Sequence, residues 1–245
     1  METIIRISQN EAELAIDLAK ELAALINKAG KKGKVLTVAL SGGNTPRLLF
    51  SILGEQYTSK VSWKSVHFFW GDERCVPPED INSNYGMTKK LLLDKIDIPA
   101  RNIHRLRGED DPEKEALRYS REINKFTVMR WNFPVFDIII LGLGEDGHTA
   151  SIFPGNERVM KTDKVCAVTV DPGSGQKRIT LTRPVINNAI NIIFLVSGSN
   201  KARIISEILD NPDTVDYPAA SIKPVFGQLK WYLDLDAATD LSQWA

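Results

Sequence analysis

The chain has 245 residues, of which 43% are hydrophobic and 25% charged, which are ordinary values for a globular protein. Its 31 Lys and Arg residues balance 31 Asp and Glu residues, so no overall field draws it to nucleic acid or to an anionic membrane. Any anion that it binds must therefore be held by a local set of donors.

Targeting and membrane signals are absent from the sequence. The N-terminal residues lack a signal-peptide pattern, and no apolar stretch approaches the roughly 20 residues that span a bilayer. The two cysteines, Cys75 and Cys166, are spaced neither as metal ligands nor as a redox pair, and we expect them to be reduced thiols. These features predict a cytoplasmic protein without a membrane or nucleic-acid partner.

The first predicted element is an amphipathic helix over residues 10–29. Its apolar face consists of Leu14, Leu18, Leu22, Leu25 and Ile26. Asn10 and Glu13 form a capping-box pattern at its start, and Gly30 is predicted to end it.

Four continuous apolar runs follow, at residues 35–40, 66–70, 136–141 and 190–196. Continuous rather than alternating runs are typical of strands buried on both faces, as in a helix-covered parallel sheet. Helical segments separate them, including 112–125 with Asp111 as N-cap and Pro112 at its first position. Residues 228–235 alternate and are predicted to be an edge strand. The pattern predicts one α/β domain over residues 1–245, a three-layer α/β/α sandwich with a mostly parallel central sheet.

Each of the four buried runs leads directly into a polar, glycine-bearing loop. These loops are SGGNTP at 41–46, GDER at 71–74, GLGEDGHT at 142–149 and SGSNK at 197–201. Ligands of open parallel sheets bind beyond the carboxyl ends of the strands, where the topology changes direction. We therefore expect the four loops to converge on one pocket.

The first loop has the features of an anion-binding turn. Gly42 and Gly43 let the backbone approach a ligand closely, and Thr45 with Pro46 opens a helix whose free N–H groups face it. The alternative is a tight strand-to-helix turn capped by Thr45. No Lys-Ser or Lys-Thr pair follows, which excludes a nucleotide P-loop.

Two further cations are candidates for holding a phosphate. Lys201 lies in the first turn of a predicted helix after the fourth run, and Arg178 lies in the segment QKRIT. Solvated surface side chains are the alternative for both.

The third loop contains a G-x-G-x-x-G pattern formed by Gly142, Gly144 and Gly147. A dinucleotide site also needs a sustained helix after the last glycine, and here Pro154 and Gly155 interrupt the chain. We therefore reject a dinucleotide cofactor. The alternative, a dinucleotide-dependent reductase, would be supported by nicotinamide binding.

His148, in the same loop, is a candidate general base, because histidine ordinarily titrates near neutral pH. Asp146 and Asp72 are two candidates for orienting it, and Arg74 for binding an anion or a developing oxyanion. A solvated charged turn is the alternative for residues 72–74. The other histidines, His67 and His104, are interpreted as structural or solvated.

Several segments resemble the 6-phosphogluconolactonases, which are related in fold to the glucosamine-6-phosphate deaminases. They are LSGGNTP (40–46), WGDER (70–74), SNY (83–85), LGLGEDGHTASIFPG (141–155), RITLT (178–182), KA (201–202) and PAAS (218–221). The resemblance extends over nearly the whole chain in the same order.

The resemblance implies a modified Rossmann-like fold and hydrolysis of 6-phospho-D-glucono-1,5-lactone to 6-phosphogluconate in the oxidative pentose phosphate pathway. It implies no metal or other cofactor and a phosphorylated sugar lactone as the small-molecule partner. The sequence leaves the oligomeric state open between a monomer and a small homo-oligomer. It makes His148 the residue that activates water and places Asp72 and Asp146 at acidic positions of the active site. The positions implicated in holding phosphate or substrate are Ser41, Gly42, Gly43, Arg74, Arg178 and Lys201.

The related deaminases supply the main rival function. After the histidine they read H-I-A-F-N-E-P, with a glutamate that serves ring opening and proton transfer, whereas this chain reads HTASIFP and has no carboxylate there. Lactone hydrolysis needs only one water, one base and a place for the oxyanion. A non-catalytic sugar-phosphate sensor with the same pocket is a further alternative.

Overall fold

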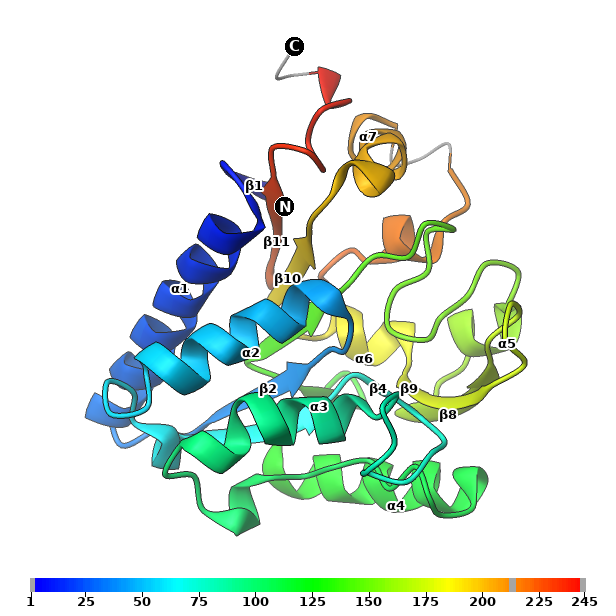
Figure 1. The fold of residues 1–245 in the computed structure, drawn as a ribbon. Helices are drawn as coiled ribbons and strands as arrows, with labels where there is room; N and C mark the ends of the chain where they lie inside the picture. The colour runs from blue at the N-terminus through cyan, green and yellow to red at the C-terminus, as the bar shows by residue number, and fades with distance from the viewer. Residues whose placement is uncertain (1–2, 212–214, 243–245) are drawn as a thin grey trace.

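The computed structural model describes residues 3–211 and 215–242, and a six-stranded parallel sheet forms its centre (Figure 1). The strand order across the sheet is β1-β11-β10-β7-β2-β3. The strands are β1 (Thr3–Ser8), β2 (Leu36–Leu40), β3 (Val66–Trp70), β7 (Ile138–Leu141), β10 (Asn191–Val196) and β11 (Gln228–Asp234).

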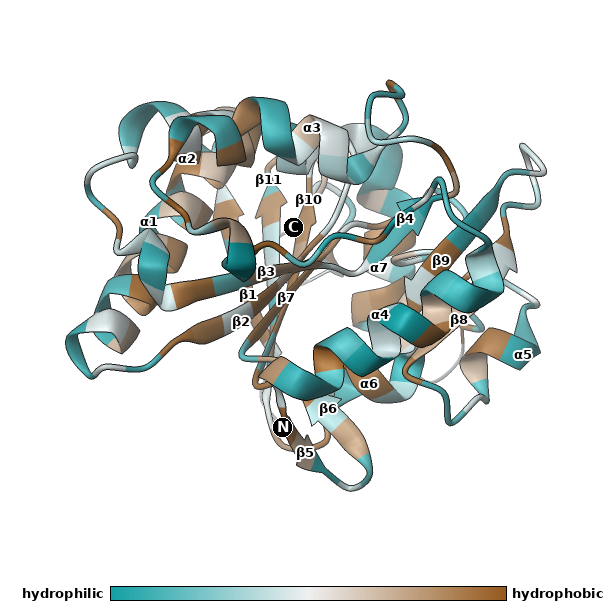
Figure 2. Ribbon diagram, turned by 90° about the horizontal axis from the view of Figure 1, so that it is seen from below, coloured by the Kyte–Doolittle hydropathy of each residue, from teal (hydrophilic) through white to brown (hydrophobic). Residues whose placement is uncertain are grey.

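Helices cover both faces of this sheet, with α1, α2 and α3 on one side and α4 and α6 on the other (Figure 2). The helices are α1 (Glu11–Lys31), α2 (Asn44–Gln56), α3 (Asn84–Leu91), α4 (Pro112–Phe126), α5 (Glu157–Met160), α6 (Arg183–Asn187) and α7 (Ala202–Asp210). Of the helices within the described ranges, none has the length and apolar character needed to cross a membrane. The predicted three-layer arrangement is confirmed.

Two smaller antiparallel sheets accompany the central one. The first has the order β4-β9-β8, and the second is the hairpin of β5 and β6. Their strands are β4 (Asp72–Arg74), β5 (Val128–Arg130), β6 (Phe133–Val135), β8 (Cys166–Val170) and β9 (Lys177–Leu181). The β4-β9-β8 sheet matters for the site, because β4 continues from the end of β3 after a single glycine, Gly71.

The four continuous apolar runs all form parallel strands of the central sheet, as predicted. The prediction of an edge strand at residues 228–235 is wrong, because β11 pairs with both β1 and β10. The side chains between its large apolar residues, Lys230 and Tyr232, are buried as well, and Glu21 of α1 receives a hydrogen bond from each. The strand at that edge is β1, which the sequence analysis did not predict.

Both predicted N-caps are confirmed. The Asn10 side chain accepts a hydrogen bond from the N–H of Glu13 at 3.0 Å, and the Asp111 side chain accepts one from the N–H of Lys114 at 3.0 Å. The predicted stop at Gly30 is wrong, because α1 continues to Lys31. A Cβ on Gly30 would lie 2.8 Å from Ser65 Oγ, so this glycine allows a close contact rather than a chain reversal.

The order of the strands determines where a ligand can bind. After β2 the chain moves outward to β3, then returns to β7 on the other side of β2 and continues to β10 and β11. The topology therefore changes direction between β2 and β7, and the loops that leave these two strands diverge to form a crevice. Those loops carry Ser41 and His148.

Candidate active site

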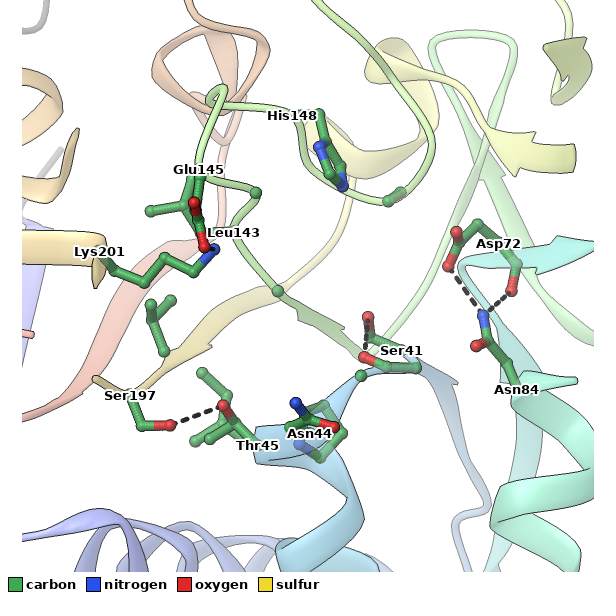
Figure 3. A pocket seen from close by; sticks show the side chains of 18 of the residues that line it. Ser41, Asn44, Thr45, Asp72, Asn84, Leu143, Glu145, His148, Ser197 and Lys201 are labelled. Atoms are coloured by element: carbon green, nitrogen blue, oxygen red, sulfur yellow. Dashed lines mark hydrogen bonds and ion pairs between the residues drawn. The ribbon is translucent and has the colours of Figure 1, made fainter. Parts of the chain in front are cut away.

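The four glycine-bearing loops meet at the carboxyl edge of the sheet around one pocket of about 520 Å³ (Figure 3). This volume suits a small phosphorylated sugar. Of the nine residues predicted for the site, the eight that line the pocket are Ser41, Gly42, Gly43, Asp72, Arg74, His148, Arg178 and Lys201. The ninth, Asp146, contacts His148 directly.

His148 and Asp146 form a hydrogen-bonded pair. Nδ1 of His148 lies 2.6 Å from Oδ1 of Asp146, and the same oxygen accepts a hydrogen bond from the backbone N–H of His148 at 3.1 Å. Because a carboxylate only accepts, Nδ1 carries the hydrogen of the neutral ring and Nε2 has a lone pair. In the part of the chain that the structure describes, no group hydrogen-bonds to Nε2. This nitrogen is available to take a proton.

Gly144 allows this pair to form. A Cβ at Gly144 would lie 2.1 Å from Nδ1 of His148 and 2.5 Å from Oδ1 of Asp146. The glycine in the G-x-G-x-x-G pattern therefore makes room for the histidine and its carboxylate. After the pattern the next helix, α5, has only four residues, which agrees with the rejection of a dinucleotide site.

Asp72 has other partners. Its Oδ2 accepts a hydrogen bond from the Ser151 hydroxyl at 2.5 Å, and its Oδ1 accepts one from Asn84 Nδ2 at 3.3 Å. Of the two carboxylates considered for orienting His148, Asp146 is the one in contact with the ring.

The glycine loop turns directly into α2. Gly43 is the N-cap with φ 105°, a conformation that favours glycine, and α2 begins at Asn44. The first N–H groups of α2 therefore face the pocket, which suits an anion. Thr45 does not cap the helix, because its hydroxyl lies 2.8 Å from the hydroxyl of Ser197 at the end of β10.

Lys201 lies on the β10 side of the pocket, in the short 3-10 helix that precedes α7. Its side chain is only 17% exposed, so the alternative of a solvated surface lysine is wrong. The Nζ atom lies 3.8 Å from Oε1 of Glu145, which also accepts a hydrogen bond from Asn200 Nδ2 at 2.5 Å. Burial lowers the pKa of Lys201, although Glu145 and Asp146 counter this effect. A partly buried cation of this kind is suited to an anionic ligand group.

Arg74 and Arg178 lie directly opposite each other in the β4–β9 ladder. Two like charges in this position repel each other, which a bound anion would relieve. Arg178 forms a short ion pair with Asp171, and Arg74 Nη1 donates to the carbonyl of Asn82 at 2.6 Å. The Nε atoms of both arginines are buried and have no hydrogen-bond partner among the described residues. Both guanidinium groups thus retain hydrogen-bonding capacity.

Glu73 is a buried anchor rather than part of a solvated turn. Its side chain is 1% exposed and accepts hydrogen bonds from the N–H groups of Arg74, Asn84 and Tyr85 and from the Ser83 hydroxyl. Burial raises the pKa of Glu73 to about 7, although the three N–H donors act in the opposite direction. Glu73 fixes the start of α3 against β4.

Sequence reasoning gave no individual role to several polar residues of the pocket. Asn84 was noticed only as part of the SNY segment, and Asn200 only as the neighbour of Lys201. Glu11 and Ser197 also line the pocket and are hydrogen-bonded to each other at 3.1 Å. Glu11 comes from the first turn of α1, and nothing in its local sequence indicates that this helix begins beside β10. Among residues 3–211 and 215–242, no cluster of three or more His, Cys, Asp or Glu side chains is placed to hold a metal ion.

Comparisons with known proteins agree on one family. Residues 9–231 match the family described as glucosamine-6-phosphate isomerases/6-phosphogluconolactonase. A 6-phosphogluconolactonase from Haemophilus influenzae is 46% identical over 199 residues, which cover 80% of this chain and 84% of that protein. One from a Nostoc species is 38% identical over 231 residues, covering 92% and 94%. The structure of 6-phosphogluconolactonase from Trypanosoma cruzi superimposes with a TM-score of 0.87 at 28% identity, covering 98% of this chain and 97% of that one.

Proposed function

The chain belongs to the glucosamine-6-phosphate isomerase and 6-phosphogluconolactonase family, and on that premise we propose that it hydrolyses 6-phospho-D-glucono-1,5-lactone with His148 as the general base. It is an enzyme of the 6-phosphogluconolactonase type, and the reaction belongs to the pentose phosphate pathway. The product is 6-phospho-D-gluconate.

One observation supports the role of His148 above all others. Its Nε2 has no hydrogen-bond partner among the described residues, while Nδ1 is held by Asp146, and the ring lines the same pocket as the glycine loop and Lys201. Figure 3 shows the ring between Lys201 on one side and Asp72 on the other, above Ser41. A base is therefore oriented and free at the centre of a pocket whose walls bear anion donors.

The phosphate is proposed to bind at the glycine loop. Ser41, the N–H groups of Gly42 and Gly43, Lys201 and Arg178 hold it, and binding at this remote end fixes the position of the lactone. The phosphate thereby receives donors from loops that follow β2 and β10 and from β9.

The chemistry then needs one water. Nε2 of His148 takes a proton from the water while the water oxygen forms a bond to the lactone carbonyl carbon. Arg74 stabilises the negative charge that develops on the carbonyl oxygen. The bond from that carbon to the ring oxygen breaks, and the protonated imidazole returns its proton to the departing oxygen. Asp146 stabilises the imidazolium throughout.

The rival deaminase chemistry is disfavoured by Phe153. This residue stands where the related deaminases carry their glutamate, and its ring lies 4.9 Å from the His148 ring and is 3% exposed. An apolar ring beside the histidine cannot shuttle a proton between the sugar carbons and the ring oxygen. The site holds the smaller set of groups that hydrolysis needs.

A coupled assay with freshly generated 6-phosphogluconolactone tests the function. We expect the lactone to disappear well above its spontaneous rate, and glucosamine 6-phosphate to give no fructose 6-phosphate or ammonia. Binding of 6-phosphogluconate without acceleration would instead indicate a sensor, and ammonia release a deaminase.

A further inference from the structure

Asp72 is a buried carboxylate without a counter-ion. Its residue is 5% exposed, and among the described residues it forms no ion pair within 4.0 Å. Burying a carboxylate is costly unless hydrogen bonds replace the lost water. Asp72 nevertheless lines the pocket, where a ligand could donate hydrogen bonds to it.

Among the described residues, two side chains donate hydrogen bonds to this carboxylate. The Ser151 hydroxyl donates to Oδ2 at 2.5 Å, and Asn84 Nδ2 donates to Oδ1 at the long distance of 3.3 Å. A carboxylate has room for about four donors. Two acceptor positions thus remain. Neutral hydroxyl groups of a ligand are suitable donors for them, because the cations of the pocket are assigned to the phosphate and to the carbonyl oxygen, and none forms an ion pair with Asp72 among the described residues.

The two donors are themselves held rigidly. Ser151 is fully buried, and its N–H donates to Thr180 Oγ1 at 3.2 Å. Asn84 is 2% exposed, its N–H donates to Glu73 at 2.7 Å, and its Nδ2 also donates to the carbonyl of Asp72 at 3.0 Å. Asp72 is therefore locked in one orientation, as a residue that discriminates between stereoisomers must be.

The location of Asp72 matches the part of the substrate that bears hydroxyl groups. The carboxyl ends of β10, β7, β2 and β3 follow one another across the sheet, and they carry Lys201, His148, Ser41 and Asp72 in that order. Lys201 and Asp72 lie on opposite sides of the pocket (Figure 3). With the phosphate at the glycine loop, bound by Lys201 and Arg178, part of the hydroxyl-bearing sugar ring comes within reach of Asp72.

We propose that Asp72, positioned by Ser151 and Asn84, accepts a hydrogen bond from a hydroxyl group of the sugar ring and so determines which phosphorylated lactones the enzyme accepts. This inference rests on the proposed function. It makes Asp72 a specificity-determining residue, with Ser151 as a positioning residue three positions after the general base.

The test pairs protein variants with substrate analogues. Wild type, Asp72→Asn and Ser151→Ala are assayed with 6-phosphogluconolactone and with its 2-, 3- and 4-deoxy analogues. For wild type, we expect one analogue to lose about 10- to 100-fold in kcat/KM, since a hydrogen bond to a charged group is removed. For Asp72→Asn and Ser151→Ala, the parent lactone loses activity, and the penalty for that same analogue shrinks to a few-fold because the two changes are coupled.

Asp137→Asn and Ser120→Ala are matched controls. Asp137 Oδ2 also accepts two neutral donors, from Thr37 N and Oγ1, and the Ser120 hydroxyl donates to the carbonyl of Ala116. Neither control should change the ranking of the analogues. Equal losses for the parent lactone and all analogues in both Asp72→Asn and Ser151→Ala would overturn the inference, whereas the proposed lactonase function of the wild-type enzyme would stand. A wild-type rate equal to spontaneous hydrolysis would instead overturn the proposed function and this inference with it.

Discussion

His148 and His104 each hold Nδ1 against a carboxylate oxygen, at 2.6 Å from Asp146 and at 2.9 Å from Glu122. His148 follows β7 at the carboxyl edge of the sheet, whereas His104 lies beside the edge strand β3, where its N–H donates to the carbonyl of Phe68 at 2.8 Å. The residue types and the hydrogen bond are alike, and only the surroundings differ.

The second ring nitrogen separates the two pairs. Nε2 of His104 lies 2.7 Å from Nδ1 of His67, and the His104 ring stacks on Phe69 at 4.4 Å. Both ring nitrogens of His104 are occupied, and the residue is 5% exposed. His148 keeps Nε2 free at a pocket. A histidine with a carboxylate partner is a catalytic candidate only when the other nitrogen can be reached by a substrate.

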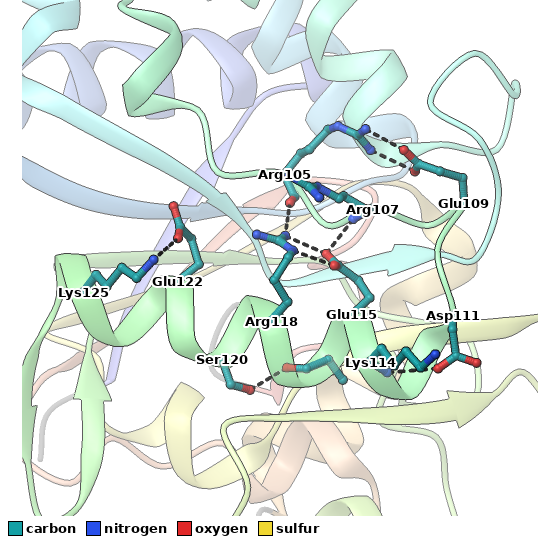
Figure 4. Close-up of polar contacts among 11 residues, drawn as sticks. Arg105, Arg107, Glu109, Asp111, Lys114, Glu115, Arg118, Ser120, Glu122 and Lys125 are labelled. Carbon is teal, nitrogen blue, oxygen red and sulfur yellow. Dashed lines mark hydrogen bonds and ion pairs between the residues drawn. The ribbon is translucent and has the colours of Figure 1, made fainter.

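The arginines of the two regions differ in the same way. Arg105 forms a bidentate ion pair with Glu109 just before α4, and within α4 Arg118 forms one with Glu115 (Figure 4). Each of these charges is matched within the protein. At the pocket, Arg74 and Arg178 face each other with Nε unpaired among the described residues. Arg183, outside the pocket, also has a buried Nε without a partner among the described residues, so the arginines of the site are distinguished by lining the pocket opposite each other.

The largest expected effect is the difference between two single variants, His148→Ala and His104→Ala. His148→Ala should lower kcat by about 10²–10⁴ and leave the fold intact, because it removes the general base. His104→Ala should keep kcat and reduce the free energy of unfolding by about 2–4 kcal/mol, because it opens a cavity beside Phe69. Steady-state kinetics and chemical denaturation of both variants check this. An undiminished rate for His148→Ala at neutral pH would remove it from the mechanism.

Replacing cations of the pocket should impair substrate binding, whereas replacing Arg118 should lower stability. The effect on binding is expected to be smaller than the loss of kcat in His148→Ala. Arg178→Met and Lys201→Ala should each raise KM about 10- to 100-fold, because each loses a charged hydrogen bond to the phosphate. Arg118→Met should leave KM unchanged and lower the free energy of unfolding by about 3 kcal/mol, because Glu115, 1% exposed, loses its counter-ion. Unchanged KM values for Arg178→Met and Lys201→Ala would contradict the phosphate assignment.

The carboxylate partners should give the next effect in size. Asp146→Asn should lower kcat about 10-fold, since a neutral amide holds the imidazolium less well than a carboxylate does. The loss is smaller than for a buried triad aspartate because the Asp146 side chain is 47% exposed. Glu122→Gln is the matched change at His104, and its kcat should equal that of wild type. Equal kcat values for the two variants would contradict the role of Asp146.

Much of the fold could be predicted because its signals are local. Continuous apolar runs mark strands buried on both faces, and the caps at Asn10 and Asp111 mark helix starts. The strand order is not local: β11 is an interior strand only because β1 pairs beside it. The antiparallel β4-β9-β8 sheet was missed because its pairing is also not local. In addition, β4 has only three residues, which is too short to give a sequence pattern.

The candidate site divides similarly. The glycine loops and strand ends indicated where His148, Ser41 and Lys201 would lie, and the structure brings them to one pocket. The choice between Asp146 and Asp72 could not be made from the sequence, because it depends on Ser151 being buried against Asp72. For Arg178 the sequence alone could not distinguish a phosphate ligand from a solvated residue, because its place in the pocket depends on the pairing of β9 with β4.

The smallest expected effect concerns pH and stability. Burial lowers the pKa of both His104 and His67. The charge of Arg118 lowers the pKa of His104 further, although Glu122 raises it, and the charge of Arg101 lowers the pKa of His67. Below about pH 6.5 the unfolded histidines bind protons that the folded ones do not, so their contribution to stability falls as the pH falls. A single histidine adds at most about 1.4 kcal/mol per pH unit to this slope.

His104→Gln measures the contribution of His104 together with the part of the lowered pKa of His67 that His104 causes, and subtraction from wild type cancels the opposite trend expected from Glu73. The difference in the free energy of unfolding between wild type and His104→Gln should be largest near pH 7.5 and should shrink by about 1 kcal/mol by pH 5.5. Denaturant titrations at both pH values measure it, with His148→Gln as the control. The His148→Gln difference should be smaller at both pH values, since that ring is partly exposed and is not stacked within the buried cluster of His67 and Phe69. A difference for His104→Gln that stays constant with pH would show that His104 is no more difficult to protonate in the folded protein than in the unfolded chain. The contrast between the two histidines would then rest on the free Nε2 of His148 alone.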